Sequence, residues 1–473
     1  MTDQLAETFD VIVIGGGPAG ENVAQYAREH GLEVALIERD LVGGECSYWA
    51  CMPSKALLRP GDVLAAARRV PGAASAVTGQ IDVAATLKTR DAFTSHWDDK
   101  HQVAWVESTG TVLLRGHGRL VGERTVKVTA NDGSMRTLVA RRGVVVATGS
   151  AAAIAAVDGL ADITFWDSRG VTSAKEIPRR LLVLGGGVVG VEMAQAFRRL
   201  GADEVTIVQR ADRLLTNEEP FVGEELQQAF EAEGIVVHTA ATVVRARRDA
   251  ANQVIVVLAD GRELVADELL VATGRRPNTV DLGLESVGLE PGKYIETNDQ
   301  LQALGVADKW LYAVGDVNGR ALLTHHGKYQ ARLVGDHLGG KTVEARADRK
   351  ALVRVIFTDP QIAAVGLTLA TAREQGRNAK TVVFDLAAIA GSALLGQGVS
   401  GTAQLVIDRA DRTILGATFT GPNVGEMIHA ATIAVVSRIT LDELWHAIPA
   451  FPTVSEVWLR LLEKDRADND ANS

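Results

Sequence analysis

Cysteine is scarce in this chain: its 473 residues contain two, Cys46 and Cys51. A disulfide-stapled fold needs more pairs, and a structural zinc site needs about four ligands, whereas no histidine lies near these two residues. A structural disulfide is not expected in a cytosolic protein, but a catalytic cysteine pair is allowed there. Two interpretations therefore stay open at this point: small buried side chains, or a redox pair.

Long apolar runs and an excess of positive charge are also missing. No apolar run reaches the length of about 18 residues that a transmembrane helix requires, so we expect no membrane insertion. The formal net charge of −10 argues against broad binding to nucleic acids or anionic membranes. No charged-then-apolar leader follows Met1, and we therefore predict a cytoplasmic protein.

Glycine is abundant, with 47 residues, and some of these glycines belong to a local sequence pattern that occurs twice. Each copy has a short apolar strand, a Gly-x-Gly-x-x-Gly turn, a helix-like stretch and a second strand. Such a turn brings a helix N-terminus to a pyrophosphate, and two copies in this context are strong evidence for dinucleotide-binding folds. The glycines are Gly15, Gly17 and Gly20 after residues 11–14, and Gly185, Gly187 and Gly190 after residues 181–184.

The ends of the two second strands differ. Glu38 ends the first, where a carboxylate can bind ribose hydroxyls. The equivalent position in the second copy is Gln209, and Arg210 follows it. Loss of the acid removes repulsion toward a 2′-phosphate and an arginine can pair with it, so the second site is predicted to take NADPH rather than NADH.

The remaining organisation predicts an α/β protein. The length corresponds to about three domains, and 47% hydrophobic with 23% charged residues is ordinary for a globular chain. A strand-plus-turn segment recurs after each glycine motif, ending in Thr148-Gly149 and in Thr273-Gly274. Past residue 350, strand-like stretches mix with a helix over residues 425–438, which indicates a separate α+β domain.

The most specific motif lies around the cysteines. Residues 43–55 read Gly-Gly-Glu-Cys-Ser-Tyr-Trp-Ala-Cys-Met-Pro-Ser-Lys and fit the pattern Gly-Gly-x-Cys-x4-Cys-x-Pro-[Ser/Thr]-Lys. Three further segments match one known family together with this pattern: residues 312–316, 323–325 and 357–360. Over nearly its whole length the chain resembles the class I pyridine nucleotide-disulfide oxidoreductases, the family of lipoamide dehydrogenase, glutathione reductase and mercuric reductase.

This resemblance implies three domains and a homodimer. Two Rossmann-like domains would bind FAD and NAD(P), and a C-terminal α+β domain would form the dimer. We place the FAD domain at residues 1–155 and 281–347, the NAD(P) domain at 156–280 and the dimerisation domain at 348–473.

The resemblance also assigns roles to single residues. Cys51 is expected to be the thiolate that faces the flavin, and Cys46 the interchange thiol that meets the substrate. Pro53 cannot donate a backbone hydrogen bond to Trp49, so the helix is expected to be distorted between the cysteines, where a regular helix would hold them apart. Further implied site residues are Lys55 paired with Glu192 beside the flavin, Asp316 on its ribitol, Gly44, Thr324 and His325 at the cofactor, and Glu456 near the C-terminus.

One position departs from the disulfide reductases of the family. Their C-terminal segment carries a His that shuttles the thiol proton across the dimer, and Phe451 stands in its place, although Glu456 remains. A positioned acid–base group is worth about 10²–10⁴ in rate. Mercuric reductase lacks this His too, but it uses an additional C-terminal cysteine pair, which two cysteines exclude here.

The predicted function is an FAD-dependent oxidoreductase of cell redox homeostasis that draws electrons from NADPH. Its acceptor is a small molecule: a disulfide, a quinone or another acceptor, reached through the Cys46–Cys51 disulfide or directly from the flavin. Two alternatives stay open: a disulfide reductase of the dihydrolipoyl dehydrogenase type that uses another base, and a flavin/thiol redox sensor without turnover.

Overall fold

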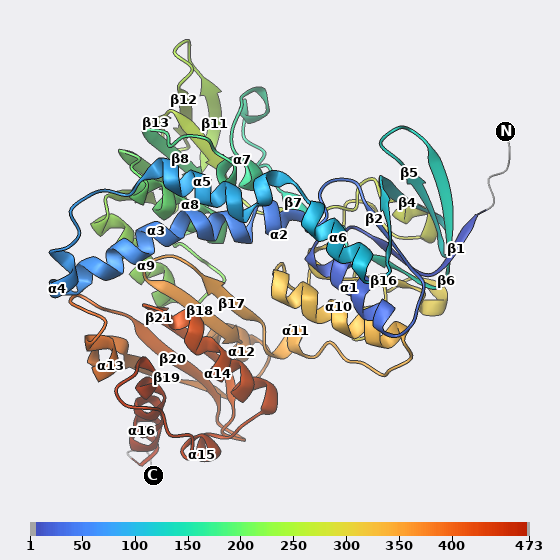
Figure 1. Cartoon of the computed structure of the whole chain (residues 1–473). Helices are drawn as coiled ribbons and strands as arrows, with labels where there is room; N and C mark the ends of the chain where they lie inside the picture. Colours follow the sequence, from blue (N-terminus) through green and yellow to red (C-terminus); the bar gives the residue numbers. More distant parts are fainter. Residues whose placement is uncertain (1–5, 471–473) are drawn as a thin grey trace. The chain divides into compact units, whose positions relative to one another are not determined.

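The computed structural model describes residues 6–470, and its backbone contacts divide the chain into two units (Figure 1). The first unit comprises Met1–Pro53, Asp91–Ala153 and Arg275–Arg349, and the second Ser54–Arg90, Ile154–Gly274 and Lys350–Ser473. The domain ranges expected from the sequence stay predictions, since contacts rather than bound nucleotides define these units.

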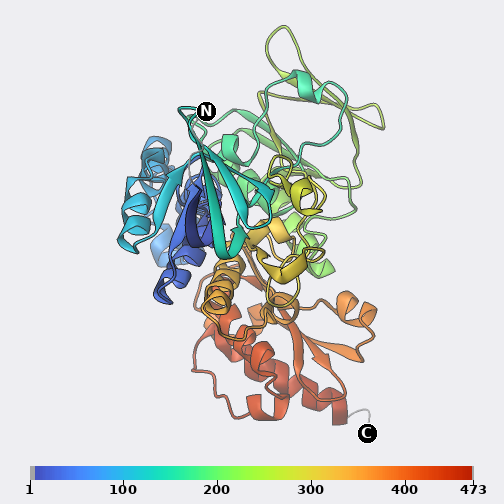
Figure 2. The same ribbon diagram turned by 90° about the vertical axis from the view of Figure 1, so that its right-hand side faces the viewer.

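The first unit is built on a seven-stranded sheet of order β3-β2-β1-β6-β5-β4, in which β16 also pairs with β6. β3, β2, β1, β6 and β16 run parallel, and β6, β5 and β4 form an antiparallel meander, drawn in teal in Figure 2. A second, two-stranded sheet joins β7 and β15. The strands are β1 (Glu7–Ile14), β2 (Val34–Glu38), β3 (Val112–Arg115), β4 (His117–Gly122), β5 (Thr125–Thr129), β6 (Met135–Val146), β7 (Ser150–Ala152), β15 (Arg275–Pro277) and β16 (Leu311–Ala313).

Helices cover the parallel part of this sheet because its central strands are apolar on both faces, as parallel strands usually are. All five residues of β2 are buried. Helix α1 packs against α10, and α6 contacts β3. The helices are α1 (Pro18–Glu29), α2 (Gly44–Tyr48), α6 (Lys100–Ser108) and α10 (Thr324–Leu338), with 3-10 turns η1 (Ser95–Trp97), η3 (Leu284–Val287), η4 (Ala307–Lys309) and η5 (Gly315–Asn318). α3 (Cys51–Arg69), α5 (Val83–Phe93) and α11 (Ala347–Lys350) each cross from one unit into the other along the chain.

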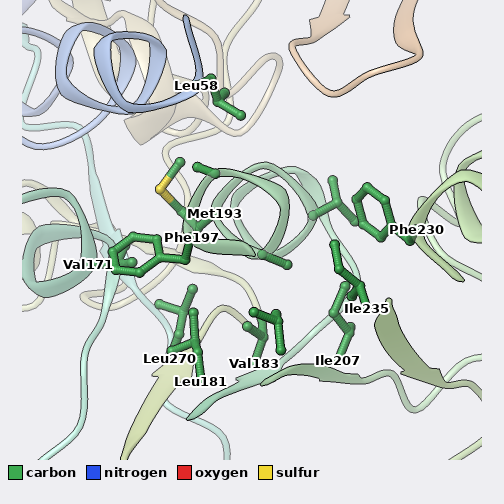
Figure 3. Packing of buried hydrophobic residues seen from close by; sticks show 14 of the residues in the cluster. Leu58, Val171, Leu181, Val183, Met193, Phe197, Ile207, Phe230, Ile235 and Leu270 are labelled. Carbon is green, nitrogen blue, oxygen red and sulfur yellow. The ribbon is translucent and has the colours of Figure 1, made fainter. Parts of the chain in front are cut away.

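The second unit contains a parallel sheet of order β10-β9-β8-β14 and an antiparallel sheet β11-β12-β13. Helix α8 packs on one face of the parallel sheet, where Phe197 and Met193 meet Leu181, Ile207 and Leu270 (Figure 3). The elements are β8 (Arg180–Leu184), α8 (Val188–Arg199), β9 (Glu204–Val208), α9 (Pro220–Ala232), β10 (Ile235–His238), β11 (Val243–Arg248), β12 (Val254–Leu258), β13 (Glu263–Ala266) and β14 (Glu268–Val271), preceded by α4 (Pro71–Ala74), η2 (Leu160–Asp162) and α7 (Ser168–Thr172).

The C-terminal part of this unit is an antiparallel five-stranded sheet of order β17-β18-β21-β20-β19. Helix α14 packs on β18 and β21, and α16 on β19; Figure 1 labels these elements. The elements are β17 (Val353–Ile356), β18 (Gln361–Gly366), α12 (Leu369–Glu374), β19 (Ala379–Asp385), η6 (Leu386–Ala388), α13 (Ala390–Ala393), β20 (Thr402–Asp408), β21 (Ile414–Gly421), α14 (Val424–Ser437), α15 (Leu441–Leu444), η7 (Val454–Glu456) and α16 (Val457–Asp470).

The α/β fold class with two Rossmann-like sheets is confirmed, as are the strands and helices predicted around both glycine motifs. The predicted α+β character of the C-terminal part is confirmed as well. Within residues 6–470, no helix combines the length and the apolar character needed to cross a membrane.

Candidate active site

The first glycine turn connects β1 to α1 and is too tight for a side chain. A Cβ on Gly20 would lie 1.8 Å from the carbonyl oxygen of Gly15, so a larger residue would force the strand and the helix apart. Gly17 is the N-cap of α1 and supplies no side-chain cap. The first N–H groups of this helix therefore receive no side-chain cap and stay available for a ligand, as at helix ends that bind a phosphate.

Glu38 lies at the end of β2, beside this turn. Its Oε2 atom accepts a hydrogen bond from the N–H of Gly16 at 2.6 Å, and burial raises the pKa of its carboxyl group. A cavity of about 240 Å³ opens next to it. This polar cavity at the strand ends fits the adenosine part of a dinucleotide. Its lining includes Gly15, Glu38, Arg39, Thr148 and Asn278.

Asp316 lies in η5, directly after β16. Ser150 Oγ donates a hydrogen bond to Asp316 Oδ2 at 2.5 Å, and Arg275 Nε donates to the same Ser150 Oγ at 2.6 Å. Burial raises the pKa of the Asp316 carboxyl. Gly149, which has φ +67°, precedes Ser150. The predicted FAD residues of the strand-plus-turn segment and of η5 thus meet at one end of the sheet.

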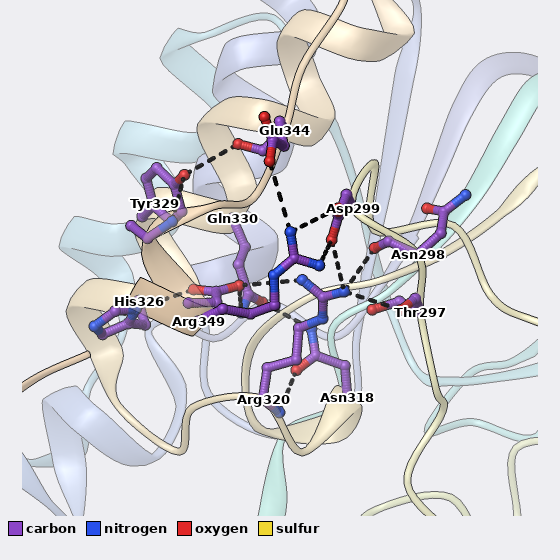
Figure 4. A network of polar contacts seen from close by, with 12 residues as sticks. Thr297, Asn298, Asp299, Asn318, Arg320, His326, Tyr329, Gln330, Glu344 and Arg349 are labelled. Atoms are coloured by element: carbon purple, nitrogen blue, oxygen red, sulfur yellow. Dashed lines mark hydrogen bonds and ion pairs between the residues drawn. The ribbon is translucent and has the colours of Figure 1, made fainter. Parts of the chain in front are cut away.

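Hydrogen bonds among buried polar side chains hold the turn that carries Asp316 in place (Figure 4). Gln330 Oε1 accepts a hydrogen bond from the N–H of Gly315 at 2.7 Å, and Gln330 Nε2 donates to Asp348 Oδ2 at 2.9 Å. The other Asp348 oxygen lies 3.0 Å from Nδ1 of His326. The network therefore links the turn to the first turn of α10.

The two cysteines lie on separate helices. Cys46 is in α2 and Cys51 begins α3, because the chain leaves helical geometry at Trp49, which has φ −138° and ψ 2°. Pro53 lies in the first turn of α3, where a helix needs no N–H donor. The distortion expected between the cysteines is confirmed.

The surroundings of Cys46 act on its protonation. Both cysteines are reduced thiols. A hydrogen bond to Cys51, burial and the negative charge of Cys51 all raise the pKa of Cys46. Cys51 Sγ also lies 3.4 Å from Thr324 Oγ1, at the start of α10. These contacts favour the protonated form of Cys46 in the reduced pair.

The second glycine turn repeats the geometry of the first, within the second unit. A Cβ on Gly190 would lie 2.0 Å from the carbonyl oxygen of Gly185. Gln209 Oε1 accepts a hydrogen bond from the N–H of Gly186 at 3.1 Å, as Glu38 does from Gly16. The amide thus replaces the carboxylate in its structural contact without contributing a negative charge.

The two arginines that follow Gln209 behave differently. Arg213 points inward and donates hydrogen bonds to backbone carbonyls, among them those of Thr216 at 2.9 Å and Glu218 at 3.1 Å. The side chain of Arg210 is exposed. Arg210 is therefore available to a ligand, whereas Arg213 shapes the loop.

Lys55 and Glu192 form an ion pair within the second unit. Lys55 Nζ lies 2.7 Å from Glu192 Oε2, and the Glu192 side chain is only 3% exposed. The backbone N–H of Phe357 donates to Glu192 Oε1 at 2.9 Å, and Lys55 Nζ lies 4.8 Å from the centre of the Phe357 ring. Lys55 and Glu192 are 137 positions apart in the sequence, and the structure pairs them as the resemblance implied.

Comparison with known proteins decides the family. Residues 9–331 match the family "Pyridine nucleotide-disulphide oxidoreductase", and residues 352–461 match its dimerisation domain. The chain belongs to the pyridine nucleotide-disulfide oxidoreductases. It is an FAD-dependent enzyme of this family, whose cofactors are FAD and NAD(P)H.

Several members of the family are similar over almost the whole chain. The mercuric reductase of Staphylococcus aureus is 32% identical over 95% of this chain and 81% of that enzyme. The dihydrolipoyl dehydrogenase of Chlorobaculum tepidum is 33% identical over 96% of both chains. The crystal structure of LpdA from Mycobacterium tuberculosis superposes with a TM-score of 0.84 at 26% identity, covering 97% of this chain and 99% of that one.

The dimerisation domain of this oxidoreductase supports a homodimer and presents an unusual loop. Phe451 is 74% exposed, and Ile448 is 90% exposed. Glu456 is buried and accepts a hydrogen bond from Arg460 at 2.6 Å, while its Oε2 atom has no hydrogen-bond partner among residues 6–470. The loop thus exposes two apolar side chains, one of them Phe451, at the position where the resemblance implied a histidine for disulfide reductases.

Some residues of the site gave no signal in the sequence. Gln330 and Asp348 hold the Asp316 turn. In the sequence each resembles an ordinary polar helix residue.

Proposed function

We propose that this oxidoreductase draws electrons from NADPH and passes them through the Cys46–Cys51 pair to a small acceptor in the cytoplasm. The observation that carries this proposal is the arrangement of the pair. The chain leaves helical geometry at Trp49, between the two cysteines, and a hydrogen bond to Cys51 raises the pKa of Cys46. Cys51 Sγ lies 3.4 Å from Thr324 Oγ1 on α10. Two cysteines that only filled space would not need the interrupted helix between them.

The residues of the chain fit FAD through the first glycine turn, Glu38 and Asp316. When bound, FAD supplies two-electron exchange between a nicotinamide and a dithiol. Lys55, held by Glu192, would keep a positive charge beside the ring, which favours negative charge developing there. Cys51 would hold the thiolate, and Cys46 would meet the acceptor. Glu456, bound to Arg460, would support the C-terminal loop.

Arg210 supports NADPH as the donor. Its exposed guanidinium follows Gln209, whose amide adds no negative charge. A charge-assisted hydrogen bond contributes about 1.5–3 kcal/mol, which corresponds to about 10- to 100-fold in affinity.

The variant Arg210→Ala is therefore expected to lower kcat/KM for NADPH by about 10- to 100-fold and to leave kcat/KM for NADH nearly unchanged. Steady-state kinetics with both nucleotides measures this. Arg179→Ala is the matched control, since Arg179 is also exposed but precedes β8 at the opposite end of the strand. Equal efficiency of the wild type with NADH and NADPH would refute the assignment.

Anaerobic titration with NADPH tests the relay itself. We expect the enzyme to take up two molecules of NADPH per FAD, one for the flavin and one for the cysteine pair, and to develop a thiolate–flavin charge-transfer band. Uptake of only one molecule of NADPH per FAD, without this band, would show that the cysteines take no electrons. Quinones, metal ions and disulfides are then compared as acceptors. A protein that binds FAD but oxidises no NADPH with any of them would be a redox sensor instead.

A further inference from the structure

Helix α2, which carries Cys46, is bound at both ends by one short segment of the first unit. At its last residue, the indole N–H of Trp97 donates a hydrogen bond to the carbonyl oxygen of Tyr48 at 3.2 Å. Before its start, Asp99 Oδ2 accepts a hydrogen bond from the N–H of Val42 at 2.7 Å. Two side chains that are two positions apart therefore bind the two ends of a five-residue helix.

The side chain of Tyr48 connects these two contacts. Tyr48 is 1% exposed, and its hydroxyl donates a hydrogen bond to the carbonyl oxygen of Val42 at 3.0 Å. A Cβ on Gly43 would lie 3.2 Å from the Tyr48 ring and 3.2 Å from the side chain of Gln102 in α6. The segment from Trp97 into α6 therefore packs closely against the start of α2 as well as its end.

Trp97 lies in a turn with an unusual backbone conformation. Ser95, His96 and Trp97 have φ angles of 49°, 53° and 57°, all of them positive. Residues with a Cβ adopt this left-handed backbone at a cost, and normally as single residues. The N–H of Trp97 closes the turn on the carbonyl oxygen of Thr94, which is 1% exposed. A strained conformation persists where the surrounding structure imposes it, and such conformations cluster at functional sites.

The carbonyl group of Tyr48 is the point at which α2 and α3 would join. In a continuous helix its oxygen would accept a hydrogen bond from the N–H of Met52, four residues further on. The chain leaves helical geometry at Trp49 instead, and Trp97 supplies a donor to this oxygen. The last carbonyl groups of a helix have no partner within the helix, so an outside donor stabilises its end. The indole of Trp97 thus favours the interruption over a continuous helix.

The interruption decides where α3 begins. This helix starts at Cys51. The first N–H groups of a helix have no carbonyl partner within it, and they favour a negative charge at this end. A cysteine at a helix N-terminus has a lowered pKa for this reason. In a helix that ran on from α2, Cys51 would lie in the interior, where the N–H groups are paired and this effect is absent.

We propose that Trp97 is a positioning residue of the redox pair, whose indole N–H maintains the interruption after Tyr48 and keeps Cys51 at the start of α3. In this role Trp97 acts through the backbone between the two cysteines. The inference rests on the function proposed above, in which Cys51 is the thiolate of the reduced pair. It adds a residue outside the cysteine motif to the groups that set the state of that thiolate.

The variant Trp97→Phe keeps an aromatic ring and removes the donor. In the NADPH-reduced, FAD-loaded enzyme the thiolate–flavin charge-transfer band is lost as the pH falls through the pKa of Cys51. We expect this loss at a pH higher by about 0.5–1 unit in Trp97→Phe, since one hydrogen bond changes an equilibrium constant by about three- to tenfold. Cys46 and Lys328, which act on the pair, are unchanged in this variant. The FAD content should equal that of the wild type.

Alkylation of Cys51 by iodoacetamide gives the same midpoint without the flavin band. It is measured against pH in the dithiothreitol-reduced enzyme, in the Cys46→Ser background, so that one thiol reacts. The midpoint should move upward with Trp97→Phe by the same amount, because iodoacetamide reacts with the thiolate.

Two further variants separate the donor from the bulk of the ring. Trp105→Phe is the matched control, since Trp105 lies on α6 and is 37% exposed. It should leave both midpoints unchanged. Benzothienylalanine in place of Trp97 has the shape of tryptophan with a sulfur atom instead of the N–H. It should reproduce the shift of Trp97→Phe, although the packing of the ring is kept.

An unchanged midpoint in the FAD-loaded Trp97→Phe enzyme or with benzothienylalanine would overturn the inference and leave the proposed function intact. An equal shift in Trp105→Phe would overturn it as well. A wild type that takes up one molecule of NADPH per FAD and forms no band would overturn the proposed function itself. The alkylation midpoints would then still decide whether Trp97 acts on Cys51.

Discussion

Cys51→Ser is expected to lower NADPH-dependent disulfide reduction by about 10⁴-fold or more, the scale on which loss of a catalytic nucleophile is measured. In the proposed relay Cys51 carries the negative charge of the reduced pair, and a serine hydroxyl cannot hold this charge at neutral pH. The charge-transfer band should therefore disappear on reduction. Absorption spectra under anaerobic conditions and steady-state rates measure the two effects.

Cys46→Ser is the informative companion to this variant. It should lose disulfide reduction to a similar extent, because no interchange thiol remains, but it should keep the charge-transfer band, because Cys51 is still present. If both variants reduce quinones as fast as the wild type, electrons reach quinones without the pair. A charge-transfer band in Cys51→Ser that is absent in Cys46→Ser would reverse the roles of the two thiols.

Lys55→Met is expected to destabilise the second unit by about 3 kcal/mol. Glu192 is 3% exposed, and removal of its cation leaves a buried carboxylate that still accepts a hydrogen bond from the N–H of Phe357. Breaking a buried pair from one side costs about 3–5 kcal/mol, and we expect the lower end because the Lys55 side chain is 33% exposed. Thermal unfolding of the FAD-loaded enzyme measures this change, and stopped-flow reduction by NADPH should slow in parallel.

The double variant Lys55→Met/Glu192→Gln is the matched control for this effect. A glutamine keeps an oxygen for the N–H of Phe357 and carries no charge, so most of the stability should return. The rate of reduction by NADPH should stay low, because the positive charge is still missing. An equal melting temperature for wild type and Lys55→Met would contradict the structural role of the pair.

Local chemistry explains which parts of the molecule the sequence predicted well. Both glycine turns, the helix distortion before Cys51 and the strands ending at Glu38 and Val208 depend on residues close together in the chain. Lys55 and Glu192 are far apart, and only the resemblance to a family paired them. The family and the fold could therefore be predicted from the sequence.

Other contacts depend on packing between segments far apart in the chain, so the sequence alone could not predict them. Arg213 belongs to the same short motif as Arg210, but the loop turns it toward three backbone carbonyls. Glu21 has the position of a favourable acidic residue in the first turn of a helix, but in the structure its Oε2 atom is buried, and α1 packs against α10. Amphipathic patterns do not encode which polar residue a neighbouring helix will cover.

The interruption between α2 and α3 has a thermodynamic consequence. Because α3 starts at Cys51, a thiolate formed at this residue lies at the positive end of a 19-residue helix. Stabilising the thiolate stabilises the dithiol relative to the disulfide and raises the reduction potential of the pair. Every 30 mV of such a rise corresponds to about 1.4 kcal/mol for a two-electron couple. The pair accepts electrons more readily for this reason, and only acceptors that are correspondingly stronger oxidants can draw them out again.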